Sequence, residues 1–111
     1  MNLEKLFKMQ KELDERILDR FPELRNEDLL DKKILALQVE LGELAQNWRG
    51  FKFWSEDQKP RTEVPVKYYS GGPTEIENWL LEEYVDCLHF ILSIGLERKK
   101  FFDSELELKA I

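Results

Sequence analysis

The feature that most constrains this chain is the spacing of its apolar residues, which recur every three or four positions through three long segments. Such spacing places them on one face of an amphipathic α-helix. The predicted helices span residues 2–20, 26–49 and 74–99. Pro22 ends the first, because the residue before a proline is pushed out of helical conformation. Gly50 is well placed to end the second.

The predicted helix ends carry capping residues. Asn26 is a suitable N-cap for the second helix. The stretch from Thr74 to Glu77 is a capping box, in which a threonine hydroxyl and a glutamate bond each other's backbone amides, and it predicts the start of the third helix. The same pattern from Ser104 predicts a short fourth helix at the end of the chain.

Residues 51–73 separate the second and third helices and hold three of the four prolines. Loops of this length are commonly functional or mobile, and a short extended piece around Val64 to Tyr69 is expected within it. With 111 residues and few glycines and prolines, the chain is predicted to be a single all-α domain, residues 1–111.

Composition narrows the classes of function. The net charge of −6 gives no electrostatic footprint for nucleic-acid backbones, and phosphates would need a divalent cation between them and the protein. The single cysteine, Cys87, excludes an intramolecular disulfide. The charged N-terminal segment lacks a secretory signal, which predicts a cytoplasmic protein. Acidic residues interrupt the most apolar stretch, residues 79–96, which argues against a membrane span.

Four carboxylates form two i, i+3 pairs, Glu40 with Glu43 and Glu83 with Asp86. Residues three apart lie on one side of a helix. Glu83 and Asp86 share their side with apolar residues, whereas Glu82 projects to nearly the opposite side. Because buried carboxylates are costly unless paired or coordinated, facing pairs on two helices predict a site for Mg²⁺ or Mn²⁺.

A second interpretation of these acids is ion pairing with nearby cations. Lys32, Lys33 and Arg49 are close enough in sequence to neutralise them. The same helical projection places His89 and Ser93 on the polar side of the third helix, away from the four acids, where His89 is expected to be structural or at the surface.

Longer strings resemble a known family. KKILALQVELGELAQNWRGFKFW, LLEEYVDCLHFILSIGL and the N-terminal LFKMQKELDERI are similar to the dimeric dUTPases of Gram-positive bacteria and their phages. That family lies within the all-α NTP pyrophosphatase (MazG-like) superfamily, whose Glu-x-x-Glu and Glu-x-x-Asp motifs match the two acidic pairs. The resemblance implies an antiparallel helical bundle completed by oligomerisation, as a homodimer or homotetramer.

The resemblance also implies a reaction. Relatives cut a nucleoside triphosphate between the α and β phosphates with Mg²⁺, so the expected reaction is dUTP and water to dUMP and pyrophosphate. Glu40, Glu43, Glu83 and Asp86 would be the metal ligands, and Glu43 would also accept a proton from the attacking water. Two alternatives remain: a MazG-like pyrophosphatase for other nucleotides, and a non-catalytic helical assembly domain that is a phage remnant.

The resemblance also assigns substrate contacts to individual residues of this chain. Gln10 matches a glutamine of the uracil pocket, and Lys52 and Trp54 match residues that approach the nucleotide. Asp14 lies where the family often has asparagine, and an ionised aspartate has no donor for a base carbonyl. The family's C-terminal phosphate-binding segment has no counterpart before Ile111. The resemblance therefore implies either a shortened form of the family's protein or a substrate site whose missing wall comes from another subunit.

Overall fold

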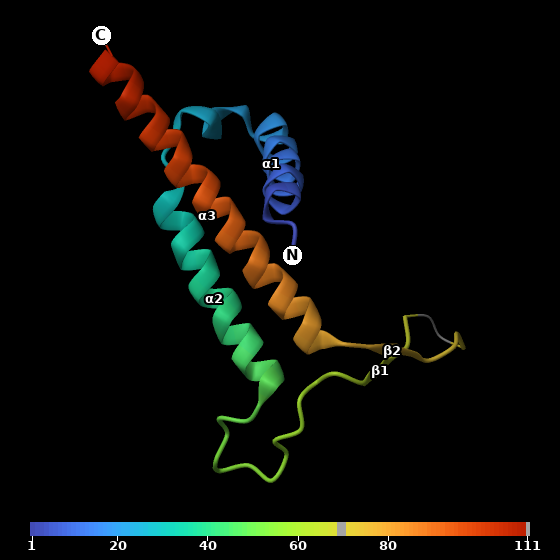
Figure 1. The fold of residues 1–111 in the computed structure, drawn as a ribbon. Helices are drawn as coiled ribbons and strands as arrows, with labels where there is room; N and C mark the ends of the chain where they lie inside the picture. The colour runs from blue at the N-terminus through green and yellow to red at the C-terminus, as the bar shows by residue number, and fades with distance from the viewer. Residues whose placement is uncertain (69–70, 111) are drawn as a thin grey trace. The chain divides into compact units, whose positions relative to one another are not determined.

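The computed structural model describes residues 1–68 and 71–110, with side chains described as far as residue 100. This part of the chain is mostly helical, with one two-stranded sheet, which confirms the all-α prediction (Figure 1). The chain forms two compact units: unit 1 is Met1–Leu37 with Leu88–Ile111, and unit 2 is Gln38–Cys87. In chain order the elements are α1 (Leu3–Arg20), the 3-10 helix η1 (Pro22–Asn26), α2 (Leu30–Trp48), β1 (Val64–Val66), β2 (Glu75–Glu77) and α3 (Trp79–Ala110).

Helix α1 in unit 1 follows the predicted range closely. Its N-cap is Asn2, whose Oδ1 accepts a hydrogen bond from the Lys5 backbone amide at 3.0 Å. The helix ends at Arg20, and Pro22 begins η1 directly afterwards. The predicted stop at this proline is therefore confirmed, because its fixed φ and missing N–H suit the start of a new turn.

The predicted start of the second helix at Asn26 is wrong. Asn26 is the last residue of η1, and α2 begins at Leu30. The Asp28 side chain takes the capping part instead, since its Oδ1 accepts from the Leu30 amide at 2.9 Å. The turn that starts at Pro22 continues through Asn26, so the chain reaches helical conformation four residues later than the capping pattern indicates.

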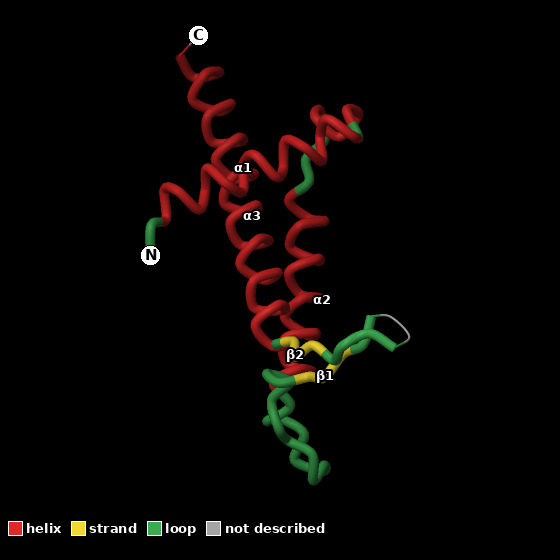
Figure 2. Tube along the Cα trace, turned by 90° about the vertical axis from the view of Figure 1, so that its right-hand side faces the viewer, coloured by secondary structure: helices red, strands yellow, loops and turns green. Residues whose placement is uncertain are grey.

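The predicted capping box at Thr74 is also wrong. The stretch Glu75–Glu77 forms β2, which pairs antiparallel with β1 so that Pro65 lies opposite Ile76 (Figure 2). Helix α3 starts at Trp79, and Asn78 caps it by accepting from the Leu81 amide at 2.9 Å. Pairing with β1 outweighs the local preference for a helix. The extended piece expected from Val64 is confirmed as far as Val66, while Tyr69 lies outside the described residues.

The short fourth helix is not present as a separate element. Helix α3 runs without a break from Trp79 to Ala110, so Ser104 lies inside it. No glycine or proline occurs between Leu96 and Ala110, and the lysines, leucines and glutamates of this stretch favour helix. The capping pattern at Ser104 therefore does not start a new helix.

The end of α2 shows why the residue at position 50 is small. Arg49 has a positive φ of 66°, so the left-handed residue after the helix is an arginine and not the predicted glycine. A Cβ on Gly50 would lie only 2.4 Å from the Trp48 indole. Gly50 therefore allows the ring of Trp48 to lie against the backbone after the helix.

The apolar stripe predicted for α2 is only partly covered within the chain. Ile34 in unit 1 is 41% exposed, and Trp48 in unit 2 is 49% exposed. In unit 1, α1 contacts α3 closely: a Cβ on Gly95 would be 3.1 Å from the Phe7 ring. None of the described helices is long and apolar enough to cross a membrane.

Candidate functional site

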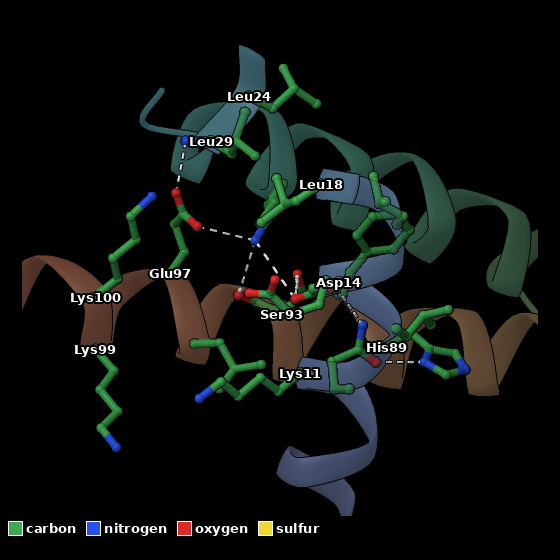
Figure 3. Close-up of a pocket in the computed structure, with 17 residues that line it drawn as sticks. Lys11, Asp14, Leu18, Leu24, Leu29, His89, Ser93, Glu97, Lys99 and Lys100 are labelled. Atoms are coloured by element: carbon green, nitrogen blue, oxygen red, sulfur yellow. Dashed lines mark hydrogen bonds and ion pairs between the residues drawn. The ribbon is translucent and has the colours of Figure 1, made fainter. Parts of the chain in front are cut away.

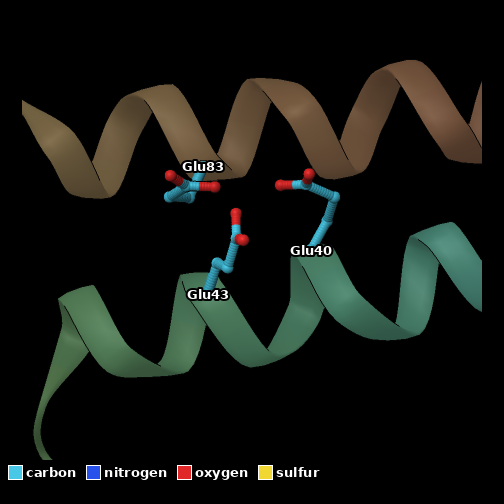
Figure 4. A group of neighbouring side chains, drawn as sticks. All are labelled: Glu40, Glu43 and Glu83. Carbon is cyan, nitrogen blue, oxygen red and sulfur yellow. The ribbon is translucent and has the colours of Figure 1, made fainter.

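Three of the four predicted metal ligands converge in unit 2. Glu40 and Glu43 extend from α2, and Glu83 extends from α3 toward them across the space between the two helices (Figure 4). Each offers a carboxylate oxygen within 4.8 Å of the other two. The i, i+3 spacing on α2 places its two acids on one side of the helix, facing Glu83.

Two oxygens of this cluster have no partner. Glu40 Oε2 and Glu83 Oε2 are both buried and make no hydrogen bond. A buried acceptor without a partner carries a desolvation cost of about 1–3 kcal/mol. Such orphaned oxygens, aimed into a group made only of carboxylates, fit a hard divalent cation, which takes oxygen ligands.

Crowding perturbs the titration of the cluster. Burial, together with the hydrogen bonds and charges of Glu40 and Glu43, raises the pKa of Glu83 from 4.5 to about 7, and burial is the largest cause. Burial also raises the pKa of Glu40, although hydrogen bonding to Glu83 opposes the rise. Glu83 therefore favours the protonated form, from which it can donate to Glu40. A cation bound in the cluster would favour the ionised form of Glu83 and so displace its proton.

Asp86 lies at the edge of the cluster. It is exposed and does not belong to the group of three converging carboxylates. Its charge nevertheless helps to raise the pKa of Glu40 and of the buried Cys87 thiol. Burial is the largest cause of the rise at Cys87, so the thiol form is favoured and a nucleophilic role is disfavoured. Glu82 is exposed, as the helical projection predicted.

Ion pairing does not neutralise these acids. The three candidate cations pair with other carboxylates of the described chain: Lys32 with Glu27 at 3.5 Å, Lys33 with Glu97 at 3.2 Å, and Arg49 with Asp57 at 3.7 Å. The second interpretation from the sequence is therefore wrong for this structure. None of these three cations compensates the charge of the cluster.

The loop after α2 carries Lys52 and Trp54. Trp54 is 66% exposed and meets the rings of Phe51 and Phe53 edge to face, with centroids 6.0 and 5.0 Å away. Lys52 Nζ lies 5.7 Å from the centroid of the Phe51 ring. Both side chains are thus held by a small aromatic group, and the indole keeps a large exposed surface on which a planar ligand can stack.

Unit 2 also contains an apolar pocket that the sequence did not indicate. Its volume is about 480 Å³. It lies between the last turn of α2 and the first turns of α3, with Thr62 from the loop on its border. The lining residues are Leu44, Trp48, Thr62, Asn78, Leu80, Leu81 and Tyr84.

The other two predicted substrate contacts lie in unit 1, in the wall of a pocket of about 500 Å³. Gln10 is buried, and its Nε2 donates to Asp14 Oδ1 at 2.9 Å. Ser93 Oγ donates to Asp14 Oδ2 at 2.8 Å. Figure 3 shows Asp14, Ser93 and His89 close together in this wall. Gln10 and Asp14 are thus neighbours in one hydrogen-bonded network.

This network extends to His89 and Ser93 on α3. His89 is exposed, as expected, and its Nδ1 lies 2.6 Å from Gln10 Oε1. Ser93, expected on the same polar side, is buried. Buried Glu97 accepts from the Leu29 amide at 2.9 Å. One signal could have shown this: His89, Ser93 and Glu97 are spaced four apart, which is a polar stripe on one face of a helix.

The comparisons with known proteins agree with this architecture. A family model described as dUTPase matches residues 2–69 and 62–110, which together include nearly the whole chain. Neither the comparison with curated proteins nor that with solved structures gave a match. The chain therefore belongs to the all-α, dimeric dUTPase family and is a dUTPase-like nucleotide pyrophosphatase.

Proposed function

We propose that this chain is a Mg²⁺-dependent nucleoside triphosphate pyrophosphohydrolase that converts dUTP and water into dUMP and pyrophosphate. The observation that carries the proposal is the convergence of Glu40, Glu43 and Glu83 with two buried, partnerless oxygens. Family membership supplies the class of substrate. Unpaired acids in a crowded group destabilise a fold. Binding of a cation that the function requires would account for their presence.

The metal would be held by Glu40, Glu43 and Glu83, with the exposed Asp86 completing the set from its edge. Mg²⁺ is the proposed ion, and Mn²⁺ can replace it because both favour carboxylate and water ligands. When bound, such an ion neutralises phosphate oxygens and favours attack by water at phosphorus. This chemistry requires no serine nucleophile.

Glu43 is proposed as the general base. It is the exposed member of the three glutamates, while Glu40 and Glu83 are half-buried. Water can therefore reach its carboxylate, and a carboxylate within hydrogen-bond distance can accept a proton as the water attacks. Glu83 holds a proton more readily than an ordinary glutamate in the metal-free protein, so it is less suited to that role.

Residues that match the family's substrate contacts occur in each unit. In unit 2, Lys52 provides a positive charge for phosphate and Trp54 an exposed ring for stacking. In unit 1, the pocket lined by Gln10 is proposed to bind the uracil base. Its mostly apolar walls suit a planar base, and its polar wall supplies hydrogen bonds. Asp14 does not need to contact the base, since its oxygens already serve Gln10 and Ser93.

A homodimer or homotetramer is the proposed assembly, as family membership suggests. Several large apolar side chains are exposed in the single chain, among them Leu35 at 62% and Val39 at 54%. Leu92, by contrast, is already buried within the single chain, at 5% exposure. Sedimentation at micromolar concentration tests the assembly, and a stable monomer would contradict it.

Release of pyrophosphate from dUTP, dCTP, dTTP and dATP, with Mg²⁺ and with Mn²⁺, tests the reaction. We expect dUTP to be preferred, and Glu43→Gln to lower the rate by a factor of at least about 100, as loss of a general base does. Glu82→Gln is the matched control, because Glu82 is exposed on the same helix as Glu83 and outside the cluster. Equal losses in the two variants, or no metal-dependent release, would contradict the proposal.

A further inference from the structure

The amide of Gln10 is held between two partners with opposite requirements. Its Nε2 lies 2.9 Å from Asp14 Oδ1, and its Oε1 lies 2.6 Å from His89 Nδ1. The Gln10 side chain is only 4% exposed, so water has little access to its amide, whereas His89 is exposed. A buried amide with two partners has a single favourable orientation if each partner can only donate or only accept.

Asp14 fixes the nitrogen end of the amide. Its other oxygen accepts from Ser93 Oγ at 2.8 Å, and Lys33 Nζ lies 3.9 Å from the same oxygen. A carboxylate paired with a lysine only accepts hydrogen bonds. The group of Gln10 that faces Asp14 must therefore be the NH₂, and the carbonyl oxygen must face His89.

The position of the carbonyl then fixes the tautomer of His89. A carbonyl oxygen only accepts, so His89 Nδ1 must carry a proton and donate it to Gln10 Oε1. In the neutral imidazole the proton is then on Nδ1 and Nε2 is bare. This conclusion follows from the acceptor character of Asp14, two hydrogen bonds away.

From this geometry we propose that His89 is a positioning residue, which together with Asp14 locks the Gln10 amide in one orientation toward a bound base. The inference rests on the proposed role of this pocket as the base site. The two internal bonds use one N–H and one lone pair of the amide, which leaves one donor and one acceptor side by side. The acceptor lies on the His89 side and the donor on the Asp14 side.

A locked amide of this kind selects the edge of its ligand. A lactam edge, with N–H beside C=O as in uracil, pairs with the free acceptor and donor without placing an acceptor against Asp14. On a cytosine edge, the amine donor and N3 acceptor are followed by the O2 acceptor. Whichever of its two acceptors pairs with the Gln10 donor, the other one then faces either the Asp14 carboxylate or the Gln10 carbonyl. Two facing acceptors repel, so the lock favours lactam bases.

The tautomer can be tested directly, because His89 is the single histidine of the chain. Nitrogen-15 NMR of the wild-type protein at pH 8.5 distinguishes a protonated ring nitrogen from a bare one. We expect Nδ1 to carry the proton and Nε2 to be bare. A spectrum with the proton on Nε2 would overturn the proposal without any mutation.

The effect on ligand choice is tested with deoxyuridine and deoxycytidine, titrated in EDTA and followed by NMR, so that neither phosphate nor metal contributes. We expect deoxyuridine to be preferred, and His89→Phe to lower that preference about tenfold, as loss of a part-buried hydrogen bond does. His89→Gln, which retains an N–H donor, should restore most of it. Arg98→Gln is the control, since Arg98 is exposed on the same helix.

The outcomes separate this inference from the proposed reaction. A loss of affinity in His89→Phe that is equal for both nucleosides would indicate a packing role and refute positioning. Failure of the wild-type protein to bind either nucleoside would also refute it, whereas metal-dependent pyrophosphate release that Glu43→Gln abolishes would still support the proposed function. Loss of the preference with rescue by His89→Gln supports positioning.

Discussion

Replacing Glu83 with glutamine should stabilise the metal-free protein at pH 8 and change its stability little at pH 4.5. The substitution keeps the volume of the side chain and removes its charge, and a glutamine N–H can take the place of the carboxyl proton facing Glu40. At pH 8 the wild-type cluster holds three carboxylates whose oxygens lie within 4.8 Å of one another, two of them with buried, partnerless oxygens. Removing one charge relieves repulsion and desolvation together.

The magnitude follows from the pKa of Glu83, which the fold raises from 4.5 to about 7. Because the folded state binds the proton more tightly than the unfolded state, the free energy of unfolding falls as pH rises from 4.5 to about 7 and is level above that. A rise of this size corresponds to at most ~3 kcal/mol at pH 8. Glu83 is half-buried, so solvent screening reduces the expected gain to about 2 kcal/mol.

Urea unfolding in EDTA at pH 4.5, 6, 7 and 8, followed by circular dichroism and tryptophan fluorescence, measures this effect. All three tryptophans lie within unit 2, so the fluorescence reports on the part of the chain that holds the cluster. The wild-type free energy of unfolding should fall between pH 4.5 and 7, and Glu83→Gln should flatten the fall. Glu82→Gln should behave like the wild type. A Glu83→Gln protein that is less stable than the wild type at pH 8 would refute the reasoning.

Mg²⁺ should reverse the order of stability. A ligand that binds only the folded state stabilises it by about 2.7 kcal/mol at a hundredfold excess over its Kd. Millimolar Mg²⁺ should therefore raise the melting temperature of the wild type, and chelator should lower it again. Glu83→Gln should lose most of this rise, because one of the three converging ligands has gone. An equal rise in both proteins would mean that the ion binds elsewhere.

Two further predictions concern buried polar contacts of the fold. Lys33→Met should lower the free energy of unfolding by about 3 kcal/mol, because it leaves the buried Glu97 without its cation; Lys32→Met, whose side chain is 75% exposed, should cost less than about 1 kcal/mol in the same urea titration. Asn78→Ala should cost about 1 kcal/mol, since its Oδ1 caps α3, whereas Thr74→Ala should leave the melting temperature unchanged; the reverse order would show that the capping box is used after all.

The sequence by itself determined the helical class and the positions of two long helices. In α1 and α2, apolar spacing and helix-favouring residues indicate the same structure. Pro22 also marks the end of α1, whereas the capping residue predicted for α2, Asn26, is wrong. That Glu40 and Glu43 share one side of α2 could also be predicted, because i, i+3 spacing depends only on the geometry of a helix. That Glu83 meets them while Asp86 stays outside the group depends on how α2 and α3 pack. The family followed from the strings around these acids.

Only the tertiary structure decided where long-range contacts outweigh local preference. The capping pattern at Thr74 is a valid local signal, but pairing of β2 with β1 uses the backbone groups of residues 75–77, and Asn78 caps α3 instead. No helical projection of a single segment can indicate such a pairing, since its partner lies about ten residues away across a turn.

The polar network of unit 1 was likewise decided by packing. Ser93 was assigned to the polar side of its helix, yet it is buried and its hydroxyl meets Asp14 of α1. His89 is exposed, as expected, and meets Gln10 of α1. The sequence specifies how residues are arranged around one helix, because that depends on backbone geometry alone. Which face another helix then covers depends on contacts between residues some 80 positions apart, and those exist only in the folded chain.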